Sequence, residues 1–116
     1  MCNNENQIKS KDSLGVLGYL IISNKQIHSY QMDVLTDFLN NYNLSIEETV
    51  IASILDGKED AITLNKSLKS FGEESEFVKN ELYYISFVLA YVDGALDSSE
   101  KVILSQMKTY VKNSFQ

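Results

Sequence analysis

The stretch Phe87-Val-Leu-Ala-Tyr-Val-Asp-Gly-Ala-Leu-Asp-Ser-Ser-Glu-Lys-Val-Ile-Leu104 decides the fold of this chain. Its first part is apolar, and Gly94 can take the positive φ that ends a helix. Leu96 is expected to turn back into the core, and Asp97-Ser-Ser-Glu100 matches the capping box that opens a new helix. The stretch therefore predicts two helices joined by a short turn.

The same pattern recurs in weaker form when the chain is shifted against itself by 69 residues. Two polar positions then correspond, because Asn24 aligns with Asp93 and Gln31 aligns with Glu100. The aligned apolar pairs are Leu20 with Leu89, Ile22 with Tyr91, Ile27 with Leu96, Val34 with Ile103, Leu35 with Leu104 and Phe38 with Met107. A helical hairpin cannot bury its own apolar face, so two such hairpins are expected to pack together. The alternative is a chance likeness between two amphipathic helix pairs, which share the same period.

Helical periodicity and capping signals predict helices and no strand along the whole chain. The expected helices cover about 13–23, 30–42, 46–56, 60–71, 76–92 and 98–114. The polar residues 1–11 are expected to form a disordered tail, and residues 12–116 a single domain. We therefore expect an all-α, single-domain bundle of about six helices with a pseudo-twofold repeat of helical hairpins.

The sequence also predicts how these helices pack. Leu82–Val92 carries no charge, which places its helix at the centre of the bundle. Gly15 and Gly18 are expected to permit close approach of a neighbouring helix, and Gly57 to stop the third helix in the left-handed conformation. The helical spacing of the tyrosines and phenylalanines favours core packing over the stacking of a ligand.

Composition excludes several classes of protein. The chain has 116 residues, 44% of them hydrophobic, and a net charge of −6 with only 10 basic residues, which argues against nucleic acid as a partner. Its single cysteine, Cys2, excludes an internal disulfide and fits a cytoplasmic location. The apolar stretch Leu14–Ile22 lacks a cleavage site and is far shorter than a membrane span of about 20 residues.

Three carboxylates at the second turn form a candidate metal site. Asp93, Asp97 and Glu100 lie within eight residues, and oxygen ligands of this kind suit Ca²⁺ or Mg²⁺. An EF-hand loop is rejected, because Leu89 and Tyr91 would occupy its first and third positions. Capping and turn geometry alone give a second explanation for the same acidic residues.

No catalytic constellation can be assembled from the sequence. His28 is the only histidine, and it lacks the neighbouring nucleophile that a catalytic dyad requires. Neither a nucleophile-elbow serine nor a phosphate-binding glycine loop occurs. We therefore interpret His28 as an ordinary turn residue and expect the chain to have no enzymatic activity.

The pattern over Phe87–Leu104 resembles the TerB-like domains of tellurite-resistance proteins and the related N-terminal region of the DjlA co-chaperones. The matching residues are Ala90, Asp93, Gly94, Leu96, Ser99 and Glu100. A fainter match covers Leu17–Leu44, where Asn24, Ile27 and Gln31 replace the usual acidic pattern. Since Asn24-Lys25 stands where the family has Asp-Gly, the first turn departs from the family pattern.

The resemblance implies an all-helical, pseudo-twofold domain without established enzymatic activity, from bacterial stress-response or phage-defence systems. It also implies an acidic, metal-binding turn, which maps to Asp93 and Glu100. Gly94, Leu96, Asn24 and Ile27 would then be structural residues of the two turns. We expect a protein-interaction module whose partner is another protein, another domain of a longer parent chain or a second copy of the chain. The alternative is a domain that senses divalent cations through the acidic Asp-Gly turn.

Overall fold

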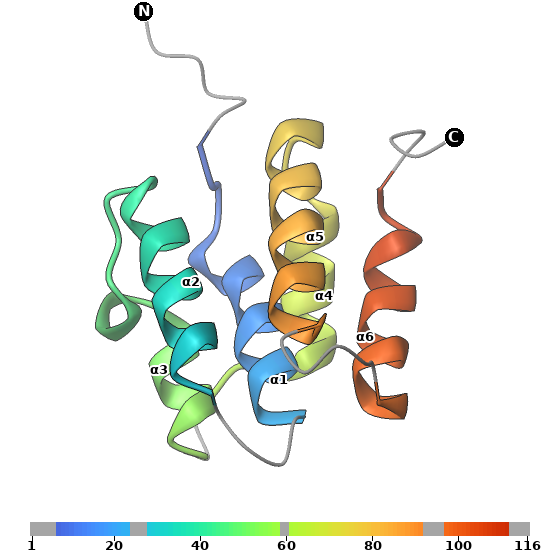
Figure 1. Cartoon of the computed structure of the whole chain (residues 1–116). Helices are drawn as coiled ribbons and strands as arrows, with labels where there is room; N and C mark the ends of the chain where they lie inside the picture. Colours follow the sequence, from blue (N-terminus) through green and yellow to red (C-terminus); the bar gives the residue numbers. More distant parts are fainter. Residues whose placement is uncertain (1–6, 24–27, 59–60, 92–96, 112–116) are drawn as a thin grey trace, which may run out of the picture.

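The computed structural model describes residues 7–23, 28–58, 61–91 and 97–111 (Figure 1). The α-helices in these ranges are α1 (Gly15–Ser23), α2 (Ser29–Asn40), α3 (Val50–Leu55), α4 (Leu64–Gly72), α5 (Glu76–Ala90) and α6 (Ser98–Lys108). Two short 3₁₀ helices, η2 (Lys11–Leu14) and η3 (Ile46–Glu48), precede α1 and α3. The described ranges contain no strand, so the predicted all-α bundle of six helices is confirmed. Over the same ranges, every helix is too short or too polar to cross a bilayer.

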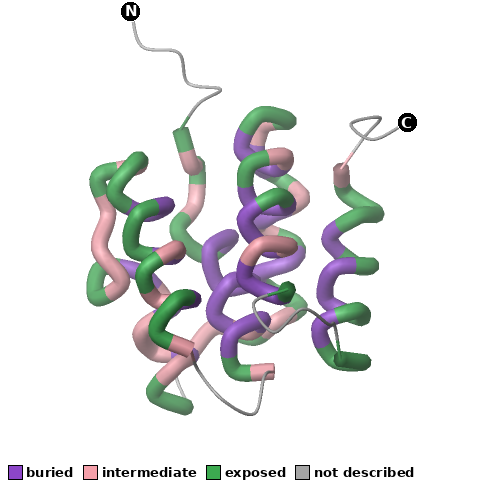
Figure 2. Tube along the Cα trace, viewed as in Figure 1, coloured by how far each residue is buried: buried purple, intermediate pink, exposed green. Residues whose placement is uncertain are grey.

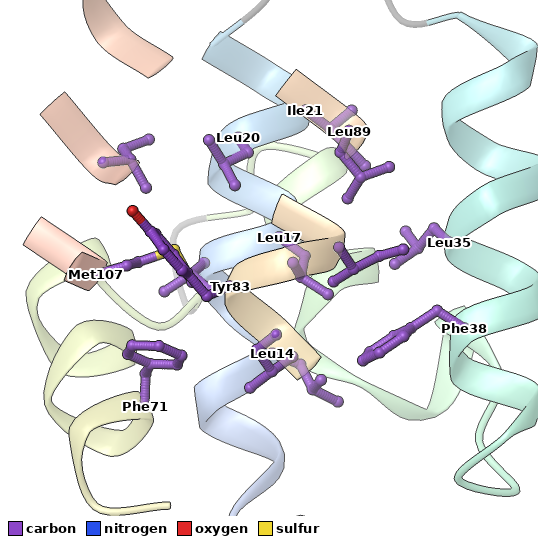
Figure 3. Close-up of a cluster of buried hydrophobic side chains, with 14 of the residues drawn as sticks. Leu14, Leu17, Leu20, Ile21, Leu35, Phe38, Phe71, Tyr83, Leu89 and Met107 are labelled. Carbon is purple, nitrogen blue, oxygen red and sulfur yellow. The ribbon is translucent and has the colours of Figure 1, made fainter. Parts of the chain in front are cut away.

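Helix α1 lies at the centre of the bundle, with α3, α4, α5 and α6 packed around it (Figures 1 and 2). Val16, Leu17, Leu20 and Ile21 are all completely buried. Figure 3 shows Leu17, Leu20 and Ile21 pointing into the apolar cluster between the helices. Because apolar residues occupy almost every position of α1, the helix has no polar stripe to turn towards water.

The prediction that helix α5 forms the centre of the domain is wrong. One face of α5 is buried through Leu82, Ile85 and Leu89, but Phe77 and Tyr84 on its other side are 46% and 66% exposed. The absence of charge suggested burial on all sides. In the folded chain, Tyr84 occupies an exposed position of α5 at which a helix on the outside of a bundle usually has a charged residue.

Two glycines allow the neighbouring helices to approach α1 closely, as predicted. A Cβ atom at Gly15 would collide with the hydroxyl oxygen of Ser67 on α4, and one at Gly18 would lie 3.1 Å from Cγ2 of Ile54 on α3. Gly57 follows α3 with φ of 69°, which confirms the predicted left-handed stop.

The contacts between the two helical hairpins follow the pseudo-twofold repeat, because the second helix of each hairpin packs on the first helix of the other. Helices α1 and α5 contact each other, while α2 packs on α5 and α6 packs on α1. In Figure 1, α2 and α6 lie on opposite sides of α1 and α5. The contact of α2 with α5 therefore corresponds to the contact of α6 with α1. The symmetry is incomplete, because α6 also packs on α5 while α2 has no equally extensive contact with α1.

Glu74, in the turn between α4 and α5, ties the N-terminal segment to the bundle. Its carboxylate accepts hydrogen bonds from the backbone N–H of Lys9 at 2.7 Å and of Ser10 at 3.0 Å, and the Ser13 hydroxyl lies 3.0 Å from Oε2. Glu74 is only 4% exposed. Residues 9, 10 and 13 are thus held against the bundle. Residues 1–6 lie outside the described ranges, so the disordered tail expected over 1–11 stays a prediction.

Candidate functional site

The second hairpin turn is described only at its end, where α6 begins. Asp97 Oδ1 accepts a hydrogen bond from the backbone N–H of Glu100 at 2.9 Å, and Glu100 Oε1 accepts one from the N–H of Asp97 at 3.1 Å. The predicted capping box is therefore confirmed, with the side chain of Glu100 buried. The remaining predicted turn residues, Asp93, Gly94, Leu96, Asn24 and Ile27, lie outside the described residues.

The predicted Ca²⁺ or Mg²⁺ site depends on Asp93 and stays a prediction. Among the described residues, no three His, Cys, Asp or Glu side chains come together as metal ligands. The two described carboxylates, Asp97 and Glu100, each use one oxygen to cap α6. A bound ion would stabilise the folded state by mass action, so a rise in melting temperature with millimolar Ca²⁺ or Mg²⁺ would support the site.

The start of α2 repeats the arrangement at the start of α6. His28 stands 69 positions before Asp97, and its N–H donates to Gln31 Oε1 at 3.0 Å, as the N–H of Asp97 does to Glu100. Gln31 is completely buried, and its Nε2 donates to the carbonyl oxygen of Leu89 on α5 at 3.0 Å. The repeat detected in the sequence thus extends to individual hydrogen bonds. His28 is the N-cap of α2.

The outer side of α5 carries a stripe of exposed aromatic residues. Phe77 and Tyr84 on α5 and Tyr91, the C-cap residue that follows it, are spaced by seven residues, so they lie along one side of the helix, and they are 46%, 66% and 48% exposed. The prediction that the tyrosines and phenylalanines pack in the core is wrong for these three residues and for Tyr30 and Tyr110, because spacing alone does not tell which face of a helix is covered. It holds for Tyr83, which is buried and points towards Met107 of α6 (Figure 3).

A hollow of about 420 Å³ lies beside this stripe, between α5 and α6, and is lined by Tyr83, Tyr84, Phe87 and Lys108. Its aromatic wall is ordered by ring contacts along α5. The rings of Tyr83 and Phe87 meet edge to face with centroids 5.0 Å apart, and Phe87 stacks on Tyr91 at 6.0 Å. Such contacts restrict the orientations of the rings.

A second hollow, of about 330 Å³, lies on the other side of Tyr84, between α2 and α5. Its lining residues are Val34, Asp37, Phe38, Asn41, Glu81, Tyr84 and Ile85. Phe38 and Ile85 are nearly buried and form the apolar floor, whereas Asp37 and Glu81 are exposed. We call this hollow the acidic groove. No motif in the sequence indicated it, since its residues come from helices that are distant along the chain.

Tyr42, close to the acidic groove, has a titration that can be tested. Burial, followed by the nearby carboxylates of Glu81 and Glu74, raises the pKa of Tyr42 from 10.0 to about 12. The folded chain therefore holds this phenolic proton more tightly than the unfolded chain, and its contribution to stability is lost as the pH rises from 10.0 to about 12.

Replacing Tyr42 by phenylalanine should reduce the loss of stability in this alkaline range. The Tyr42 hydroxyl is buried without a hydrogen-bond partner among the described residues, so Tyr42→Phe should also raise the free energy of unfolding near neutral pH by up to about 1 kcal/mol. Urea unfolding across the pH range checks both effects, with Tyr30→Phe, at an exposed position, as the control. Equal alkaline slopes in all three proteins would contradict the assignment.

Comparison with known proteins gave no further indication of function. No family model matches the chain, and no significant similarity to a curated protein or to a solved structure was found.

Proposed function

We propose that this chain is a TerB-like, non-catalytic module of a bacterial stress-response or defence system, and that it works by binding another protein. The observation that carries this proposal is the exposed aromatic stripe Phe77, Tyr84 and Tyr91 on α5. Large aromatic residues that remain outside the core supply much of the binding energy at protein interfaces.

The arrangement of the stripe supports a binding surface rather than incidental exposure. Tyr84 is 66% exposed and separates two hollows, one lined by aromatic residues and the other acidic. Single exposed apolar residues are common on proteins, whereas several large ones on one face, with hollows beside them, favour an interaction site. The hydrogen bonds at the start of α2 and at the start of α6 are equivalent. This equivalence supports the TerB-like part of the proposal, because duplicated hairpins are expected in that family.

Photo-crosslinking in the bacterial cell tests the proposed function. A benzophenone amino acid replaces Tyr84 in one variant and Asn65, on the exposed side of α4, in a matched control. We expect a discrete protein adduct from position 84 and none, or a much weaker one, from position 65. Equal adduct patterns from both positions, or no adduct from position 84, would contradict a binding role for the stripe.

A further inference from the structure

We propose that the acidic groove between α2 and α5 receives a helical segment of the partner, with an apolar stripe bordered by lysine or arginine. This inference rests on the proposed function, since it names the chemistry of the protein that the module binds. It follows from the shape of the groove, from the charge at its rim and from the position of Tyr84.

The shape of the groove suits a helix. Helices α2 and α5 pack side by side, and Phe38 and Ile85 close the space between them at the bottom. A furrow between two packed helices with an apolar floor is the kind of site into which an amphipathic helix lays its apolar face. Val34 and Tyr84 extend the apolar contact along the furrow and up one wall.

The charge of the groove selects a basic partner. Asp37 on α2 and Glu81 on α5 both line it, and no lysine or arginine is among the described residues that do. Neither carboxylate forms an ion pair or a hydrogen bond with another residue that the structure describes. A lysine or arginine on each flank of a docked helix would pair with these two carboxylates, and the net charge of −6 adds a longer-range attraction for a basic segment.

Tyr84 extends the contact beyond the groove. Its ring lines both the acidic groove and the aromatic hollow beside α6, so a helix in the groove would contact a side chain that is now mostly in water. An exposed tyrosine at the edge of a groove offers a large apolar area at a small cost in conformational entropy.

A peptide selection on the intact chain tests the inference. The probe is a displayed library of random peptides of about 16 residues, or roughly four helical turns. We expect the selected peptides to place apolar residues at i, i+3 or i+4, and i+7, with lysine or arginine on both flanks. The dissociation constant of a selected peptide is then measured by fluorescence anisotropy for the wild type and for single variants.

The charge-reversing variants Asp37→Lys and Glu81→Lys should each weaken binding by about fivefold or more, the equivalent of about 1 kcal/mol. Glu47→Lys, an equal change of charge at an exposed position of η3 outside the groove, should change the constant by less than about twofold. Tyr84→Ala should also weaken binding while leaving the fold intact. Added salt should weaken binding to the wild type more than to Asp37→Lys.

The inference is overturned if the selected peptides are neutral or acidic, if no peptide is selected, or if the three lysine variants bind equally. It is also overturned if the chain forms a dimer that Asp37→Lys dissociates, because the groove is then filled by a second copy. In any of these cases, an adduct formed from position 84 in cells would still uphold the proposed binding function.

Discussion

Replacing Leu17 by alanine is expected to lower the free energy of unfolding by about 3–4 kcal/mol. Leu17 is completely buried on α1, the helix with neighbours on nearly every side. The substitution removes apolar contacts and leaves a cavity that helices packed from several directions cannot easily close. Urea unfolding followed by circular dichroism measures the loss.

Val102→Ala on α6 is the matched control, because it also shortens an aliphatic side chain within a helix. Val102 is 55% exposed, so its loss should cost less than about 0.5 kcal/mol. If Leu17→Ala cost no more than Val102→Ala, α1 would not be the centre of the fold.

Replacing Glu74 by alanine is expected to cost about 2–3 kcal/mol. The substitution removes the acceptor for the N–H groups of Lys9 and Ser10, whereas the Ser13 hydroxyl keeps the carbonyl oxygen of Ser10 as an acceptor at 2.7 Å. Hydrogen bonds to a charged acceptor are stronger than neutral ones, and partly buried donors left without an acceptor add a desolvation cost. Hydrogen exchange should in addition become faster at the amides of residues 9 and 10.

The neighbouring Glu73 provides the control for this second substitution. Its side chain is exposed, so Glu73→Ala removes the same charge from the same turn without removing those hydrogen bonds. We expect a change below about 0.5 kcal/mol. Comparable losses from Glu73→Ala and Glu74→Ala would show that the charge, and not the connection to the N-terminal segment, accounts for the effect.

Local signals in the sequence were enough to predict six α-helices in the right order, although the helix expected over 46–56 is divided into η3 and α3. Asp97-Ser-Ser-Glu100 is a capping box whose hydrogen bonds span three residues, so the sequence places both partners next to each other. Gly57 ends α3 through its own positive φ angle, so this stop depends on a single residue of the sequence. The alignment of Gln31 with Glu100 identified two buried residues with the same role at the start of α2 and of α6.

Features that depend on how the helices are placed in space could not be predicted in the same way. The hydrogen bonds of Glu74 to Lys9 and Ser10 join residues more than 60 positions apart, and no local pattern marks them. The acidic groove combines Asp37 with Glu81 only because α2 lies beside α5. The prediction of α5 as the centre is wrong because residue type alone does not show which side of a helix faces the core. Apolar and aromatic residues occur on buried faces and also on exposed ones.

We infer that the exposed ring of Tyr84 contributes to binding a partner and contributes little to folding. The most direct measurement places the crosslinker at Phe77, on the same stripe, and compares the adduct yield with and without Tyr84→Ala, alongside the free energy of unfolding. We predict that Tyr84→Ala changes stability by less than about 0.5 kcal/mol and removes most of the adduct. A large loss of stability, or an unchanged yield of adduct, would contradict the claim.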